Sequence, residues 1–474
     1  MSRTFASLVT AAAAVALAGC NLDLTNPNNP TLGGALTNPR AATSRMITGV
    51  LSSYRDGRAV QIRSLGSFGR ETYFMFITDG RFITGPYRDW KQNSAFEAGT
   101  QWGGRYGNYR NAYTAMQIIS STTALTDGEK AGALGVLKTF IALDMLAAIE
   151  ARGAIGAVVD MTDDVNAVHA IVSQDSVYAW ISAKLDEANA DLTAAGTTAF
   201  HFPLHTGFSA FGVAANTPAG FAQFNRAIKA RVEVKRGSLG CGATCYNAAL
   251  TALGGTWISD LTVANRDNGV YLIYSTAAGD TPNTMSLTGT SDLHVHPSID
   301  SIAGVAADDR YVRKTTAVPA RSQVGVTANR RPSVYATQTS PIPIIRNEEL
   351  VLLRAEARWF TGNTAGAITD LLGVRTNSGA SNGGTAAVAF AAPANNADFT
   401  TELLLQRTLS LYVEAQRWVD YRRFGRLAAL GTLGQDVAAG FTVATASVLP
   451  SQECDARSRV GAPAPLSCPG NPIP

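Results

Sequence analysis

Residues 341–357, with the sequence PIPIIRNEELVLLRAEA, decide the fold of this chain of 474 residues. Beyond the two prolines, apolar side chains recur at spacings of three and four: Leu350, Leu353, Ala357 and Phe360. This spacing places them on one face of a helix, which Thr361-Gly362 ends. The stretch therefore predicts an amphipathic helix that begins near Asn347 and packs its apolar face against another element.

The same helical period returns in segments on both sides of this one. The clearest segments lie at residues 106–116, 134–148, 177–192, 221–232, 363–372 and 404–418. Polar turns separate them, and Ser173 or Asp175 is placed to cap the third segment, which Gly196 ends. Helix pairs at both ends of the chain predict a tetratricopeptide-like array, although the repeat of about 34 residues typical of such arrays is not visible.

The stretch from residue 237 to 340 has a different character. It is rich in Gly, Thr, Ser and Asp, and it contains only short candidate strands such as residues 269–274, GVYLIY. Long segments of this kind are usually functional or disordered. The sequence thus predicts a mostly-α fold of paired helices, with a long loop-rich central insertion and minor β-structure.

The N-terminus has the pattern of a lipoprotein signal peptide. One basic residue, Arg3, precedes a short apolar run that closes with Leu17-Ala18-Gly19-Cys20. The run is shorter than the roughly 20 apolar residues that a membrane span needs, so cleavage before Cys20 and acylation of that cysteine are predicted. The alternative is an ordinary signal peptide in which Cys20 is incidental.

These features divide the chain into five parts. Residues 1–19 are the predicted signal peptide, and residues 20–36 a lipidated linker whose prolines and turn-forming residues prevent a helix. An N-terminal helical region is expected at residues 37–236, the loop-rich segment at 237–340 and a C-terminal helical region at 341–474. The protein is expected to be a soluble body tethered to a membrane.

Charge and motifs exclude several classes of function. Of 39 Lys and Arg residues one, Arg3, lies in the signal peptide, which leaves 38 against 36 Asp and Glu, a net charge of +2. Nucleic acid requires a concentrated basic face and is not an expected partner. The chain contains no GxSxG, P-loop, dinucleotide or HExxH motif, so no catalytic residue, cofactor or metal is predicted, and the five histidines are expected at the surface or in loops.

The remaining cysteines form two local pairs, Cys241 with Cys245 and Cys454 with Cys468. An exported protein meets an oxidising environment, so two disulfides, each closing a short loop, are the simplest interpretation. A zinc site built from all four cysteines is the alternative, although the spacing is not that of two zinc knuckles.

Charged residues accompany the apolar stripe of the last predicted helix. Arg407, Glu414 and Arg417 are spaced to lie near one helical face, where they can pair with Glu356 of the earlier helix. These four residues are predicted to form a structural ion network. A catalytic carboxylate pair of Glu356 and Glu414, as in glycosidases, is the alternative, and the neighbouring arginines favour the structural role.

The candidates for ligand binding lie at residues 70–90, RETYFMFITDGRFITGPYRDW. Glycines and a Gly-Pro pair break this stretch, so much of it is expected to be loop. Sugar rings bind to flat aromatic faces, and planar charged side chains bond to their hydroxyls. Four residues supply this combination and are the predicted ligand-binding residues: Arg81, Tyr87, Asp89 and Trp90. Ordinary burial is expected for Tyr73, Phe74 and Phe76.

The segment 341–357 resembles the helix-start motif of the SusD/RagB family, and Gly362-Asn363 follows it as in that family. The late segment is also similar, from Arg407 through Arg417-Trp418 to Gly425, although Gln406 stands where the family usually has Glu and Ala415 replaces its Gly. Together with the motif at Cys20, the resemblance covers nearly the whole mature chain.

The resemblance implies a non-catalytic, lipid-anchored protein of the outer membrane, exposed at the cell surface. Such a protein binds nutrients, above all oligosaccharides, and delivers them to a SusC-like TonB-dependent transporter. Its ligand contacts are expected from the early segment and the central loops. Two alternatives are an all-helical polysaccharide-degrading enzyme that uses a carboxylate pair, and a helical-repeat scaffold for envelope proteins. The sequence does not identify the ligand, because similar proteins bind different glycans and some bind peptides.

Overall fold

The computed structural model describes residues 38–288 and 292–473. The predicted signal peptide, the linker to residue 36 and the lipidation site Cys20 lie outside these residues. The first half of the described chain forms α3 (Pro39–Phe68), β1 (Thr72–Phe74), α4 (Arg81–Tyr87), α5 (Gly103–Ser121), α6 (Asp127–Arg152), η1 (Gly153–Ile155), α7 (Gln174–Ala195), η2 (Thr206–Phe208), α8 (Pro218–Arg236), η3 (Gly237–Cys241) and α9 (Ala243–Gly254).

The second half is made of shorter elements. In chain order they are β2 (Gly269–Leu272), β3 (Leu293–Val295), α10 (Pro297–Asp300), η4 (Val305–Ala307), α11 (Asp309–Lys314), β4 (Thr315–Gln323), β5 (Val326–Pro332), β6 (Ile342–Arg346), α12 (Asn347–Phe360), α13 (Thr364–Val374), η5 (Arg375–Gly379), α14 (Asn396–Ser410), α15 (Arg417–Arg423), η6 (Leu427–Gly431), α16 (Gly434–Ala438) and α17 (Ser451–Arg459).

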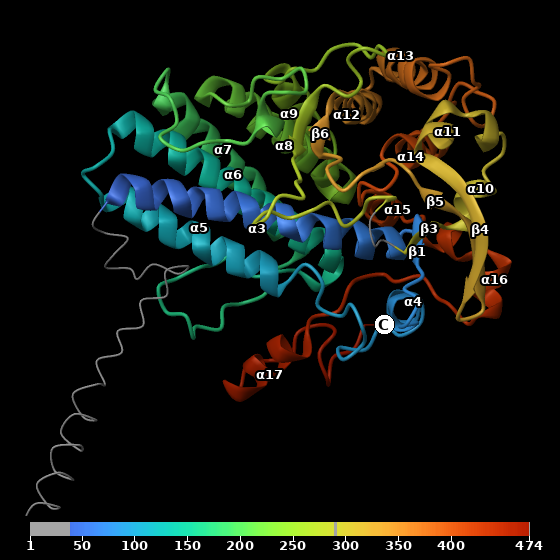
Figure 1. Ribbon diagram of the computed structural model, residues 1–474, viewed down its shortest axis with the longest axis horizontal. Coiled ribbons are helices and arrows are strands. Elements are labelled where there is room, and N and C mark those ends of the chain that lie inside the picture. The colour runs from blue at the N-terminus through green and yellow to red at the C-terminus, as the bar shows by residue number, and fades with distance from the viewer. Residues whose placement is uncertain (1–37, 289–291, 474) are drawn as a thin grey trace, which may run out of the picture.

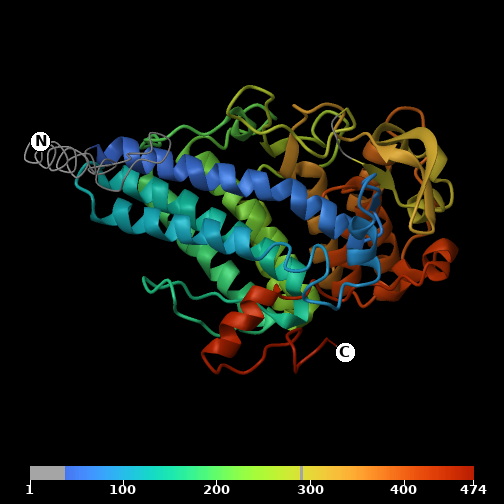
Figure 2. The ribbon, with the colours of Figure 1, turned by 60° about the horizontal axis from the view of Figure 1, so that its bottom comes forward.

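Long helices from the first half lie side by side, and the shorter elements of the second half gather at the other end of an elongated molecule (Figure 1). Successive helices from α5 to α9 pack on one another, and α12 packs on α13. The same two-part arrangement is visible when the molecule is turned (Figure 2). The predicted mostly-α class, with paired helices and little β-structure, is confirmed.

Local sequence fixes where these helices begin. Thr126 and Glu129 form a capping box at the start of α6, because each side chain bonds to the backbone N–H of the other. Ser173 caps α7 through the backbone N–H of Ser176, and Gly196 follows its last residue. These are the start and stop signals that the sequence contains.

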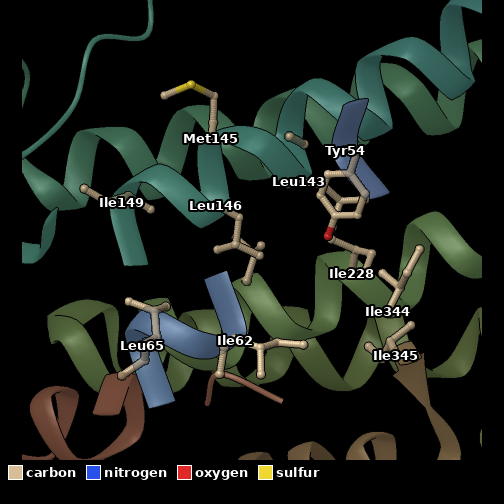
Figure 3. Close-up of a cluster of buried hydrophobic side chains, with 14 of the residues drawn as sticks. Tyr54, Ile62, Leu65, Leu143, Met145, Leu146, Ile149, Ile228, Ile344 and Ile345 are labelled. Carbon is tan, nitrogen blue, oxygen red and sulfur yellow. The ribbon is translucent and has the colours of Figure 1, made fainter. Parts of the chain in front are cut away.

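Helix α6 is the centre of the hydrophobic core. Its apolar side chains pack in one core cluster with those of α3 and α8, and Figure 3 shows Leu143 and Leu146 on the side of α6 toward these two helices. By length and composition α6 is the one helix of the described chain that resembles a membrane span, but most of it is buried inside the protein. It is therefore the core helix of the bundle.

Helix α3 was not predicted, although it is 30 residues long. Asn38 caps it and Pro39 occupies its first position, which is a common start signal. Its apolar stripe is hard to recognise in the sequence, because the buried residues Ile47, Tyr54 and Ile62 alternate with Ser, Thr, Arg and Gln. The helix is stabilised by tertiary packing more than by its own apolar pattern.

The last predicted helix is interrupted. Helix α14 ends at Ser410 and α15 starts at Arg417, with Val413 and Ala415 at φ of 60° and 63° between them. Neither residue is glycine, so their residue types did not predict a left-handed backbone conformation. Arg407, Glu414 and Arg417 therefore do not share one helical face, and that prediction is wrong. Ala415 stands where the SusD/RagB pattern has glycine, and its backbone conformation is one that favours glycine.

Candidate functional site

A cleft of about 140 Å³ lies where three distant parts of the chain meet. Helix α3 supplies Ala59 and Arg63, the early segment supplies Phe74 and Phe76, and the central segment supplies Thr284, Met285 and Leu293. The early segment and the central segment are the parts expected to bind ligand. The cleft is therefore the candidate functional site.

A two-stranded antiparallel ribbon brings these parts together. Strands β1 and β3 pair so that Phe74 lies opposite Leu293, and the N–H of Met75 donates to the carbonyl of Asp292 at 3.0 Å. The pairing joins residues more than two hundred positions apart in the sequence. It places Phe74 and Leu293 on the same wall of the cleft.

Arg63 is the cation of the cleft. Its guanidinium carbon lies 4.9 Å from the ring centre of Phe74 and 5.2 Å from that of Phe82, and its Nη2 forms an ion pair with Glu97. The rings of Phe74 and Phe76 each pack edge to face with the ring of Phe82, and they are tilted against each other. A cation above rings that are locked by their neighbours forms a rigid wall with one charged group.

The β4–β5 hairpin forms the outer rim. The side-chain amide of Gln323 donates to the carbonyl of Phe76 at 2.8 Å, and Arg321 pairs with Asp292 at 2.8 Å. Ile77, next to the hairpin, is 76% exposed. Phe76 is half-buried, so part of its ring faces the cleft. The cleft thus offers an apolar wall, a hydroxyl from Thr284 and a guanidinium.

Two of the four predicted ligand-binding residues are buried in the core, and for them the prediction is wrong. Tyr87 is 0% exposed, with its ring under the Arg70 guanidinium and its hydroxyl donating to the carbonyl of Thr72 at 2.7 Å. Trp90 is 6% exposed, and its indole N–H donates to the hydroxyl of Thr442 at 3.0 Å. Neither ring has a face that a sugar can reach.

The other two predicted residues are accessible but lie outside the cleft lining. Arg81 is exposed and binds Asp79, and this hydrogen bond holds the pKa of the Asp79 carboxyl below its usual value. Asp89 is partly exposed and pairs with Arg88 at 3.1 Å. Their role in ligand binding stays a prediction.

Three residues of the cleft, Arg63, Thr284 and Met285, were not predicted from the sequence, and Phe76 was expected in the core. Arg63 lies on α3, the helix that was not predicted, and the other two lie in a loop without a motif. The signal available for Phe76 was its place shortly before Gly80, in a segment that glycines and a Gly-Pro pair interrupt.

The predicted ion network exists in two separate parts. Asp420 accepts hydrogen bonds from Arg407 at 2.7 Å and from Arg423 at 2.9 Å, and Arg423 also binds Glu356 at 2.7 Å. Although burial opposes ionisation, the two guanidinium groups hold the pKa of Asp420 below its usual value. Glu356 and Arg407 thus share a buried network through residues that the prediction did not include.

Glu414 and Arg417 lie elsewhere. Glu414 pairs with Arg346 at 2.8 Å, and Arg417 donates to the carbonyl of Arg70. Because Glu356 and Glu414 each bind an arginine, both are engaged in holding elements together.

The histidines and cysteines are also located. His294 and His296 are buried rather than superficial, and His296 lies 3.1 Å from Asp436, with a pKa lowered to about 4 by burial.

Disulfides join Cys241 to Cys245 and Cys454 to Cys468, with Cα separations of 5.7 and 5.5 Å. Among the described residues, no group of three or more His, Cys, Asp or Glu is placed to hold a metal ion.

Known proteins share this architecture. Residues 300–453 match the model of the SusD family. NanU of B. fragilis has a similar structure, with a TM-score of 0.61 and 17% identity over 90% of this chain and 95% of its own. A laminarin binding SusD-like protein gives a TM-score of 0.62 at 14% identity, over 87% and 97% of the two chains.

A SusD superfamily protein from Bacteroides vulgatus ATCC 8482 gives a TM-score of 0.63 at 12% identity, over 88% of this chain and 97% of its own. No curated protein matches the sequence. The resemblance predicted from residues 341–357 is confirmed: the chain has the SusD fold over most of its length, and residues 300–453 match the SusD-family model.

Proposed function

We propose that this protein binds nutrients, oligosaccharides in particular, at the cleft between α3, β1 and the central segment. The observation that carries this proposal is the SusD fold, shared with a protein described as laminarin binding. The cleft supports it, because a rigid wall of rings beside one guanidinium and one hydroxyl suits a ligand with an apolar face and polar edges.

The proposal includes a cellular setting. Acylation at Cys20 would tether the protein to the outer membrane, and a SusC-like TonB-dependent transporter would receive the ligand. The signal-peptide pattern of residues 1–20 and the SusD-family match support this setting.

The protein is proposed to bind without catalysis. The carboxylates Glu356 and Glu414, which were considered as a catalytic pair, are 0% and 5% exposed and each binds an arginine. A glycosidase needs one carboxyl group that can act as an acid beside another that can act as a base or nucleophile.

Affinity electrophoresis against laminarin and a set of other soluble polysaccharides tests the binding. Retardation by at least one polysaccharide is expected, and Phe76→Ala should weaken it about tenfold or more. Phe211→Ala is the matched control, because Phe211 is also half-buried and packs on Tyr271 at 4.2 Å but does not line the cleft. Equal weakening by both variants would contradict a site at the cleft.

The setting and the absence of catalysis have their own tests. Mass spectrometry of the mature protein should show a diacylated or triacylated cysteine at residue 20, and affinity purification from membranes should recover a TonB-dependent transporter. Incubation with the bound polysaccharide should release no shorter products. Turnover that disappears in Glu414→Gln would instead favour an enzyme.

A further inference from the structure

A second and larger cavity, of about 500 Å³, lies between the start of α5, the loop of residues 158–169 and α17. We call it the tail cavity and define it by Trp102, Tyr106, Arg110, Asp160, His169 and Glu453, which line it. No described residue lines both this cavity and the cleft at Phe76. The two are separate sites on the protein.

The loop that forms one wall is fixed to α5. A β-bridge between Ala157 and Val172 closes its base. The hydroxyl of Tyr106 donates to the carbonyl of Val158 at 2.9 Å and accepts from the N–H of the same residue at 2.8 Å. Tyr109 adds a hydrogen bond to the carbonyl of Val159 at 3.1 Å. The wall is therefore positioned before any ligand arrives.

Helix α17 forms the opposite wall, and its residue Glu453 connects it to Trp102 at the floor of the cavity. Glu453 accepts a hydrogen bond from the indole N–H of Trp102 at 3.1 Å and one from Arg457 at 2.8 Å. Beneath, the Arg152 guanidinium lies 5.3 Å from the Trp102 ring centre and donates to the carbonyl of Ser447 at 2.8 Å. The disulfide between Cys454 and Cys468 ties α17 to the C-terminal tail.

The composition of the lining indicates the chemistry of a ligand. Two arginines, Arg110 and Arg457, are balanced by two carboxylates, Asp160 and Glu453, so the site has no strong preference for a charged ligand. The Asp160 carboxylate and the Arg110 guanidinium are planar and can bond neighbouring hydroxyls, while Glu453 and Arg457 bind each other. The half-buried ring of Tyr106 and the exposed side chains of Val165 and Val168 supply the apolar surface beside them, and the buried indole of Trp102 supports the Tyr106 ring.

We propose that the tail cavity is a second ligand-binding site and that it takes one or two rings of a neutral saccharide. The volume lies within the range of about 300 to 1,000 Å³ found for small-molecule sites. The SusD-family match ends at residue 453, so most of α17 and the disulfide-tied tail lie beyond it. The site is thus built in part by a segment that the family pattern does not describe, and it does not depend on what the cleft at Phe76 binds.

Saturation-transfer NMR on the full mature chain tests the proposal, with glucose, galactose, mannose, N-acetylglucosamine and their common β-linked disaccharides as separate probes. Ala456→Phe is the blocking variant, because Ala456 lines the cavity on the exposed side of α17. Arg459→Phe is the matched control, since it adds the same ring to the same exposed helix outside the lining. Phe76→Ala reports separately on the cleft.

Saturable binding of at least one probe, with a Kd in the millimolar range or tighter, is expected. Ala456→Phe should weaken it at least tenfold, while Arg459→Phe and Phe76→Ala leave it unchanged. Asp160→Ala, a change at an exposed loop residue, should weaken it as well. Absence of binding for every probe would overturn the proposal, as would binding that Phe76→Ala removes and Ala456→Phe does not. Failure of the cleft to bind polysaccharide would leave these expected results unchanged.

Discussion

Val324 has a backbone conformation that valine rarely adopts. It forms the two-residue turn of the β4–β5 hairpin with Gly325, and both residues have positive φ, 51° and 82°. Such turns favour Asn-Gly, because a β-branched side chain collides with its own backbone in this region. The turn lies on the rim of the cleft, where the neighbouring Gln323 binds the carbonyl of Phe76.

Val324→Asn should therefore stabilise the protein, by about 1 kcal/mol. Urea denaturation followed by circular dichroism measures the change. Val312→Asn is the control, since Val312 is also exposed but lies within helix α11, where asparagine is less favourable than in a turn. An equal gain in both variants would show that added polarity, not the relief of backbone strain, is responsible.

Glu71 is a second residue with an unusual environment. It directly precedes β1 and is 1% exposed, and burial raises the pKa of its carboxyl to about 8, against the opposing charge of Arg417. Glu414 and Asp420 also face it and raise the pKa further. The carboxyl group is thus largely protonated at neutral pH.

This shift makes stability depend on pH in a defined direction. The pKa is higher in the folded protein than the value of 4.5 for an unperturbed glutamate, so the folded state binds the proton more tightly. The stabilising contribution is complete below about pH 4.5 and is lost as the pH rises through about 8. Glu71→Gln, which keeps the neutral form, should be less sensitive to pH than the natural protein between pH 5 and 8. If the urea midpoints of the two proteins changed equally with pH across this range, the raised pKa of Glu71 would be refuted.

At the scale of elements, the contact between α6 and α7 depends on a glycine. A Cβ at Gly135 would lie 2.6 Å from Cγ of Leu192 and 2.9 Å from the carbonyl oxygen of Ala188. Gly135→Ala should therefore destabilise the protein by about 1 to 3 kcal/mol through overpacking. Gly107→Ala in α5 should do the opposite, by about 0.5 to 1 kcal/mol, because nothing lies within 4 Å of its Cβ and alanine is the better helix former. Thermal unfolding of the two variants compares them directly.

The sequence predicted elements where local signals agree with the tertiary fold. Helices α6, α7, α8 and α12 each carry an apolar stripe, and α6 and α7 also have clear caps. It did not reveal α3, whose polar sequence is stabilised by its neighbours, or the break before α15, whose left-handed residues are Val413 and Ala415. In both cases the deciding contacts come from other parts of the chain.

Helix α17 is held at its start by a disulfide, and this connection is testable. Cys454 and Cys468 are separated by 14 positions, and closing a loop of that size contributes about 3 kcal/mol in the chain-entropy model. In a variant with both cysteines changed to serine, backbone amides of α17 should exchange with deuterium faster while those of α6 do not change. The same change at Cys241 and Cys245 is the control and should leave α17 unaffected. Slow exchange in α17 without its disulfide would mean that Glu453 and Trp102 hold it unaided.

For the molecule as a whole, the fold class and the resemblance to the SusD family could be predicted, and the candidate cleft largely could not. The early segment and the central loops both line the candidate cleft, and their role in ligand binding stays a prediction. Aromatic residues within them, however, divide between core and surface in a way that only the fold decides: Tyr87 is buried, and Phe76 is partly open. Tertiary packing selects which ring is available, and a single sequence does not record it.

The β1–β3 ribbon also has a consequence for how the protein acquires its binding surface. The bundle from α5 to α9 is assembled from helices that are neighbours along the chain, and such local contacts form quickly. The cleft at Phe76 instead requires residues 72–74 to meet residues 293–295, which leave the ribosome much later. The helical half therefore has time to fold first, and the new chain passes through an intermediate whose helical scaffold is built before the cleft exists.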